Sequence, residues 1–257
     1  MTEAEWLTCD DPDKMLRQAR FRSYPRKSRL FAVACCRLVS HLLVDERSRK
    51  AVDIAERFAD GAATNDELHV ASVAANKAHQ KMFNSLGKSG ACIEWAAVLA
   101  ADANAFHGAK NVIWAASTPR TYEVRKSRKN DWDEIELFPC AVKKRSGPLS
   151  PVLSRLQVEK LDEAVATPAK RLVQAALIHC IFGNPFRPVT LDPAWLTPKV
   201  KTLAQGIYDD RAFERMPELA NALAEAGCSN PDILSHCRGP GPHARGCWVV
   251  DPVLGKE

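Results

Sequence analysis

Cysteine and histidine residues gather near the C-terminal end of the sequence. Thiolate and imidazole groups are ligands that zinc prefers, and a structural zinc ion takes four of them in a tetrahedron. Neighbouring side chains on a helix point about 100° apart, so His236 and Cys237 are poorly placed to bind one ion together. A set made of Cys228, Cys237, His243 and Cys247 is easier to build. We therefore expect a structural zinc site drawn from five residues: Cys228, His236, Cys237, His243 and Cys247.

The same residues allow two other interpretations. A buried thiol beside a capping histidine explains them without any metal. A cysteine-dependent enzyme is the second alternative, in which His236 or His243 activates the thiol of Cys237 or Cys247 as a nucleophile. That chemistry needs a thiolate in a partly exposed, electropositive pocket, and the sequence identifies no third group to orient the histidine.

A strongly basic stretch lies near the N-terminus. Residues 17–50 hold ten lysines and arginines against two acidic residues, although the whole chain carries only +5. Arginine matches phosphate oxygens, and each neutralised phosphate releases counterions. A nucleic-acid-binding face is therefore an alternative function, and a helix face that pairs with acidic residues elsewhere in the chain is the other interpretation. The candidate contacts to phosphate or to an acidic partner are Arg17, Arg20, Arg22, Arg26, Lys27 and Arg29.

Several function classes find no support in the 257 residues. The sequence has no G-x-S-x-G, H-E-x-x-H or G-x-G-x-x-G motif. No apolar run approaches the ~18–20 residues that a membrane span needs. The N-terminus is acidic and polar, unlike a secretory signal peptide. We expect a cytoplasmic protein without a membrane partner.

Apolar residues recur with a helical period almost throughout, which predicts an all-α fold. Thr2 with Glu5 and Thr64 with Glu67 form capping boxes, and Asp45 is placed to cap a further helix. Helices are expected over 27–43, from Asp45 to Gly61, and from Thr64 through Phe83; after Gly87 and Gly90, one or two more are expected over 91–116.

The chain divides into three parts by composition. Residues 1–116 form an N-terminal helical region, and 117–150 form an irregular basic connector with a short strand around Glu134–Phe138. Residues 151–257 form a C-terminal helical region that packs with 1–116 as one globule. A proline- and glycine-rich turn then leads into an extended segment at Cys247–Val250. The expected architecture is an irregular multi-helix domain with a long connector and a short extended tail.

Several segments resemble a family of uncharacterised planctomycete paralogues. The resemblance rests on Glu5–Leu7, Leu30–Arg37, Asp45–Arg49, Phe182–Pro188, Asp192–Pro198 and His236–Val250. It implies a shared scaffold that includes the N-terminal Cys-Cys helix and the Cys/His tail. It also leaves open a metal site assembled from both ends, with Cys35 or Cys36 as a ligand, and it implies no catalytic residue.

The leading hypothesis from the sequence is a non-enzymatic helical interaction module. Its partner would be a protein or an acidic polymer, and zinc near the C-terminus would be structural. Nucleic-acid binding through the basic 17–50 stretch and cysteine-dependent catalysis at the tail are the alternatives.

Overall fold

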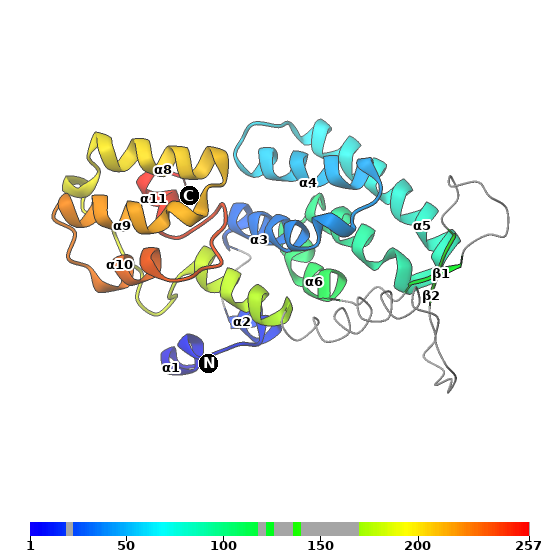
Figure 1. The fold of residues 1–257 in the computed structure, drawn as a ribbon, viewed down its shortest axis with the longest axis horizontal. Coiled ribbons are helices and arrows are strands. Elements are labelled where there is room, and N and C mark those ends of the chain that lie inside the picture. The colour runs from blue at the N-terminus through cyan, green and yellow to red at the C-terminus, as the bar shows by residue number, and fades with distance from the viewer. Residues whose placement is uncertain (19–22, 118–121, 126–135, 140–169, 257) are drawn as a thin grey trace.

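The computed structural model describes residues 1–18, 23–117, 122–125, 136–139 and 170–256, and its fold is all-α, as predicted (Figure 1). The N-terminal helices are α1 (Glu3–Leu7), α2 (Pro12–Gln18), α3 (Pro25–Leu38), α4 (Glu46–Ala59), α5 (Asn65–Ala100) and α6 (Ala105–Ser117). A helix over 170–182 follows, and then α8 (Pro198–Asp210), α9 (Met216–Glu225), α10 (Pro231–Arg238) and α11 (Val250–Val253). Single 3-10 turns lie at Ser40–Leu42, Pro193–Trp195 and Phe213–Arg215.

The helix starts follow local side-chain chemistry. Both predicted capping boxes form: Thr2 and Thr64 each accept a hydrogen bond from the backbone N–H three residues later, and Glu5 and Glu67 complete them. The Asp45 carboxylate accepts from the N–H of Arg47 at the start of α4. These caps satisfy backbone donors that the first helical turn leaves free, which is why the sequence locates them well.

The prediction that Gly87 and Gly90 interrupt a helix is wrong, because α5 runs through both of them. A glycine costs a helix about 1 kcal/mol relative to alanine. The packing of α5 against α4 and α6 outweighs that cost. The chain turns instead after Ala100, where the Asp102 side chain accepts from the N–H of Asn104 and α6 begins.

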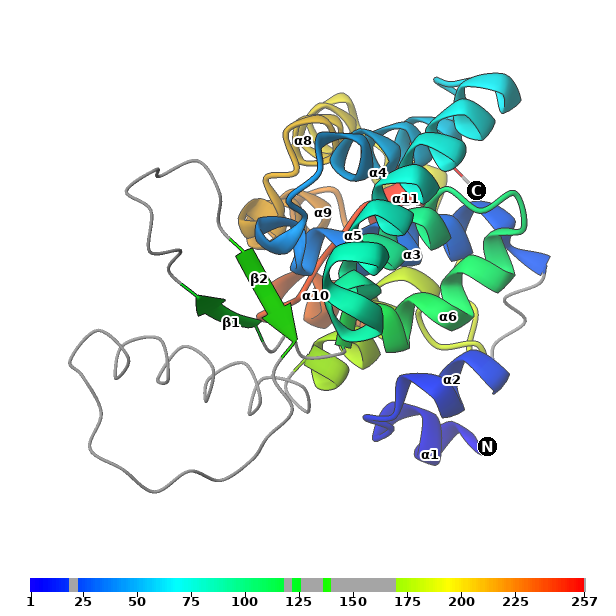
Figure 2. The same cartoon turned by 90° about the vertical axis from the view of Figure 1, so that its right-hand side faces the viewer.

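The connector contains a short antiparallel hairpin beside α5 (Figure 2). Strand β1 (Tyr122–Arg125) pairs with β2 (Glu136–Pro139), so a strand is present where one was expected around Glu134–Phe138. The other connector residues, 118–121, 126–135 and 140–150, lie outside the described residues.

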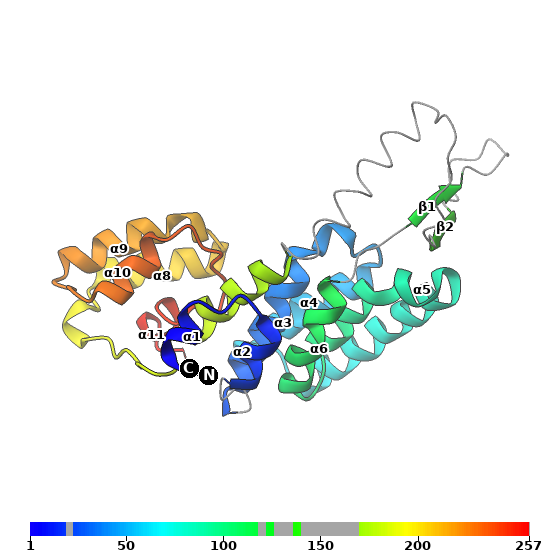
Figure 3. The same cartoon turned by 90° about the horizontal axis from the view of Figure 1, so that it is seen from below.

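Buried apolar side chains form two clusters. The first lies among α1–α6 and includes Trp6, Phe31 and Ile113. The second lies among α8–α11 and includes Ile207. Figures 1 and 3 show α3–α6 at one end of the molecule and α8–α11 at the other. Helix 170–182 joins them, because Ile178 belongs to the first cluster while Cys180 belongs to the second.

The tail is not extended to its end, contrary to the prediction for Cys247–Val250. It is irregular from Gly239 to Ala244 and then turns into the short helix α11. Val249 and Val250 are both fully buried in the second cluster, so core packing sets their conformation. Among the described residues, no helix combines the length and apolarity needed to cross a bilayer.

A buried charged seam connects α3 and α4 to the C-terminal helices. The Glu56 carboxylate, 3% exposed, accepts hydrogen bonds from Arg37 at 2.7 Å and from Arg211, and it lies 3.3 Å from Arg245. Asp60 accepts from Arg26 at 3.0 Å and from the hydroxyl of Tyr208 at 2.5 Å. We call this set the Glu56–Asp60 seam. Its longest direct contact, between Glu56 and Arg245, joins residues that are 189 positions apart along the chain.

The seam makes stability depend on pH. Burial alone would raise the pKa of Glu56, but hydrogen bonds from Arg211 and Arg37 hold it below its usual value of 4.5. A carboxyl group with a lowered folded-state pKa stabilises the fold above its unfolded pKa, and that stabilisation is lost as pH falls through the folded value. The Glu56→Gln variant should therefore lose about 3–5 kcal/mol of unfolding free energy at pH 7, and its stability should fall less steeply below about pH 4.5.

The matched control is Asp53→Asn. Asp53 also binds Arg37, at 3.0 Å, but its side chain is 61% exposed. An exposed pair contributes less than about 1 kcal/mol. Urea unfolding at several pH values separates the two variants, and equal losses would contradict the role of Glu56.

Candidate metal centre

Four potential ligand atoms converge where the tail meets helix 170–182. They belong to Cys180, His236, His243 and Cys247, and all lie within 4.8 Å of one another. The Sγ of Cys180 is 3.7 Å from Nδ1 of His243, and Nε2 of His236 is 3.2 Å from the Sγ of Cys247. It is the only such cluster among the residues that the structure describes.

These separations suit a tetrahedral ion. With zinc–sulfur and zinc–nitrogen bonds of about 2.3 and 2.0–2.1 Å, a sulfur and a nitrogen of one tetrahedron lie about 3.5 Å apart. The two measured sulfur–nitrogen distances, 3.7 and 3.2 Å, fall on either side of that value. The four groups could hold one metal ion with small side-chain adjustments.

Backbone interactions fix two of the ligands. The N–H of Trp248 donates to the carbonyl oxygen of Cys180 at 2.9 Å, which places Cys247 beside the end of helix 170–182. Gly183 follows that helix with φ +62°, and a Cβ atom there would lie 3.0 Å from Cγ of Trp248. The Trp248 ring in turn packs on His236, with the ring centroids 5.2 Å apart. His236 itself lies in the last turn of α10, whose start is capped by Asn230.

The turn at Gly241 positions His243. Gly241 has φ +80°, and a Cβ atom there would lie 3.0 Å from the backbone nitrogen of His243 and 3.2 Å from its ring. Only a residue without a side chain fits so close to the imidazole. Nδ1 of the ring is turned towards Cys180, and Nε2 is buried without a hydrogen-bond partner among the described atoms.

Neighbouring groups shift the pKa values of the two cysteines in opposite directions. Burial acts to raise the pKa of Cys247, but hydrogen bonds with Cys180 and His236 bring it well below its usual value. The hydrogen bond to Cys247, together with burial, raises the pKa of Cys180. A divalent cation would bind both sulfurs as thiolates, so metal binding would release protons.

Burial argues against a nucleophilic role for these sulfurs. Cys247 lies within reach of the His236 imidazole, as a nucleophile and its base would. However, Cys247 is 0% exposed and Cys180 only 2%. A catalytic thiol must meet its substrate, so the geometry fits a closed ligand set better than a reactive one.

The structure brings together three of the five residues predicted as ligands: His236, His243 and Cys247. Cys228 and Cys237 do not join them. Both are buried in the second cluster, and burial raises the pKa of Cys237.

The fourth group, Cys180, was not among the predicted ligands, because it lies among apolar residues in the sequence, as a core cysteine does. Cys35 and Cys36 are also remote from the centre: both are buried in the first cluster, and the Cys36 thiol donates to the Ala96 carbonyl oxygen at 3.2 Å.

Two of the six basic candidates, Arg26 and Arg29, make contacts inside the fold. Arg26 binds Asp60, Tyr208 and Asp251, and Arg29 donates to the carbonyl oxygens of Ala100 and Asp102 at the end of α5. Lys27 is half-buried, and burial lowers its pKa.

Arg17 is exposed on α2, while Arg20 and Arg22 lie outside the described residues. Phosphate or acidic-partner contact by this set stays a prediction.

Comparison with known proteins adds no further constraint. No family model, curated protein or solved structure matches the chain. The resemblance to planctomycete paralogues therefore stays an expectation, and the arguments about function rest on the geometry of the chain itself.

The close contact between Gly183 and Trp248 gives a test of how the centre is supported. In the Gly183→Ala variant the new methyl group must displace the indole that packs on His236, in addition to the cost of a left-handed alanine, about 1–2 kcal/mol. Gly227→Ala is the control, because Gly227 also has positive φ and no atom within 4 Å of an added Cβ. Thermal unfolding should show the larger loss for Gly183→Ala, and equal losses would contradict the proposed support.

Proposed function

We propose that this protein is a non-enzymatic helical interaction module whose C-terminal part is fastened by one structural zinc ion. The ligands are Cys180, His236, His243 and Cys247. The observation that carries the proposal is the convergence of these four ligand atoms within 4.8 Å.

A set of two sulfur and two nitrogen ligands favours zinc among the common divalent ions, since calcium and magnesium take oxygen ligands. Four protein ligands fill the coordination sphere, which leaves no position for a reactive water. Burial of both sulfurs supports the same conclusion. The proposed ion therefore stabilises structure and does not take part in catalysis.

The location of the centre explains what the ion would stabilise. Cys180 lies on the helix that reaches into both apolar clusters, whereas His236 ends α10 and the other two ligands lie on the tail. One ion would tie these three segments together. Structural zinc sites in small peptides contribute roughly 10–16 kcal/mol of apparent binding energy, a large amount beside ordinary domain stability.

The proposed interaction role follows from the closed coordination sphere of the proposed zinc site. A filled, buried coordination sphere offers no chemistry to a substrate, so the rigid helical scaffold itself would be the functional part. We expect its partner to be a protein or an acidic polymer, since the chain carries a net charge of +5.

Metal analysis tests the zinc site directly. Protein purified without chelators should contain about one zinc per chain, and Cys180→Ser should contain less than about 0.2. Cys228→Ser is the matched control, because Cys228 is equally buried but lies outside the cluster. It should keep its zinc even if its melting temperature falls.

A second measurement separates loss of metal from loss of fold. Cobalt bound to two thiolates and two imidazoles should give the visible absorption of a tetrahedral site in the wild type and in Cys228→Ser, but not in Cys180→Ser. A strong chelator should lower the melting temperature of the first two proteins only. Equal zinc content in Cys180→Ser and wild type would overturn the proposal.

A further inference from the structure

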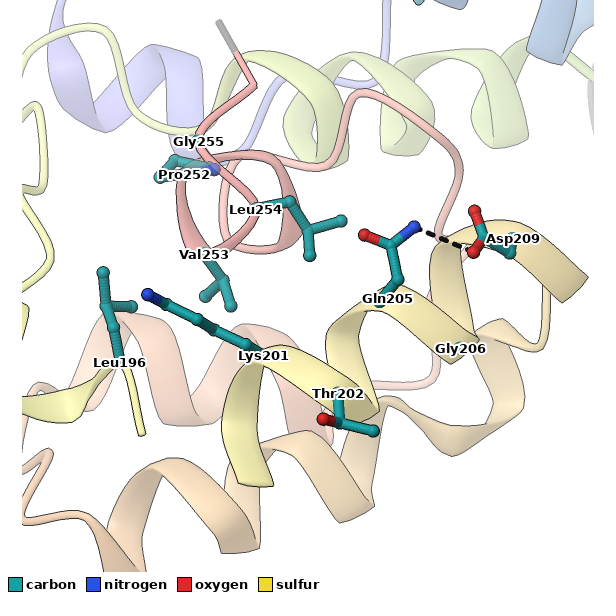
Figure 4. A pocket seen from close by; sticks show the side chains of 10 residues that line it. All are labelled: Leu196, Lys201, Thr202, Gln205, Gly206, Asp209, Pro252, Val253, Leu254 and Gly255. Carbon is teal, nitrogen blue, oxygen red and sulfur yellow. Dashed lines mark hydrogen bonds between the residues drawn. The ribbon is translucent and has the colours of Figure 1, made fainter. Parts of the chain in front are cut away.

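Two grooves flank the solvent-facing side of α8. One, of about 710 Å³, lies between α8 and α11 and is lined by residues that include Pro252 and Leu254 (Figure 4). The other, of about 800 Å³, lies between α8 and α9 and is lined in part by Ala222. Thr202 and Gly206 line both grooves, so these two small residues form a low ridge between them.

Neither the backbone conformation nor the surrounding described residues require glycine at position 206. It lies inside α8, and a Cβ atom there would meet only the Nη1 of Arg215, at an ordinary 3.9 Å. Glycine inside a helix costs about 0.5–1 kcal/mol relative to alanine. A glycine in such a place is useful when another backbone approaches closely from outside.

The charges of α8 also oppose its own dipole. Lys199 and Lys201 lie at the N-terminal end, and Asp209 and Asp210 form the last two positions. Cations are favoured at the C-terminal end of a helix and anions at the N-terminal end. Lys199 pairs with Glu225 across a groove, but both side chains are more than 60% exposed, so that pair contributes little.

We propose that α8 is the contact helix of a symmetric dimer, in which α8 of a second copy of this chain packs antiparallel against it. At 3.6 residues per turn, Lys199 and Asp210 lie on one flank of the Thr202 ridge, and Lys201 and Asp209 lie on the other. In this antiparallel arrangement the two-fold axis passes near the middle of α8, so each flank of the helix faces the same flank of the second copy. Lys199 then faces Asp210 of the second copy, and Lys201 faces Asp209 of the second copy.

This arrangement accounts for both unusual features of α8. The reversed charge order becomes four complementary contacts, because each end of the helix meets the opposite end of its copy. Gly206 lets the two backbones approach, and the flanking grooves receive the larger side chains of the other copy. The dimer does not depend on the metal centre, which uses neither α8 nor its grooves.

Charge exchange gives a specific test of the pairing. Sedimentation equilibrium of the full chain, at up to about 100 µM protein and about 50 mM salt, should show a monomer–dimer equilibrium that weakens as salt is added. Lys201→Glu and Asp209→Lys should each weaken self-association at least about 10-fold, since like charges then meet across the axis. An equimolar mixture of the two variants should associate again, because each then carries the charge that the other lacks.

Two further variants make the result decisive. Gly206→Leu should block the close approach and give a monomer, while its melting temperature stays equal or rises because leucine is the better helix former. Lys110→Glu, an exposed reversal on α6, should leave association unchanged. A wild-type chain that stays monomeric throughout would overturn the proposal. A dimer that Lys201→Glu leaves intact, or a mixture that fails to associate, would overturn it as well.

Discussion

The docking of the C-terminal helices depends on a few polar groups that are buried and must be compensated inside the protein. A charged side chain removed from water costs several kcal/mol unless opposite charges or hydrogen bonds compensate it. Glu56 is 3% exposed and Cys247 is 0% exposed, and neighbouring groups lower the pKa of each. Glu56 has arginines around it. Cys247 has imidazoles and a second thiol, an environment that a divalent cation would complete. The C-terminal helices must dock in one arrangement for both groups to be satisfied.

The two buried sites are connected through α11. The N–H of Asp251 donates to the carbonyl oxygen of Cys247 at 2.9 Å, and its carboxylate binds Arg26, which also binds Asp60. A shift of the tail at Cys247 therefore moves a partner of the Glu56–Asp60 seam. The candidate metal-binding cluster and the seam therefore lie in one connected set of contacts, so changes at one should not be energetically additive with changes at the other.

Features that depend on residues close together in the sequence could be predicted. Contacts between distant segments could not. The capping residues Thr2, Asp45 and Thr64 act on backbone groups within three residues, so their helix starts could be predicted. His243 and Cys247 also stood out by their spacing. Cys180 lies 63 residues before His243, and its place among the candidate ligands depends on how helix 170–182 docks. Its apolar neighbours are the same as those of a core cysteine, so no local pattern separates the two roles.

The basic stretch shows why the charge of a segment does not by itself identify a partner. Residues 17–50 are strongly basic, yet Arg26 and Arg37 neutralise Asp60, Asp251 and Glu56, which lie outside that stretch. Arg29 serves the carbonyl groups that end α5. Each of these arginines would have to give up a buried contact to bind an external phosphate. An acidic partner would therefore contact basic residues that the fold leaves exposed, such as Arg17. Arg26 and Arg37 compensate acidic side chains inside the protein.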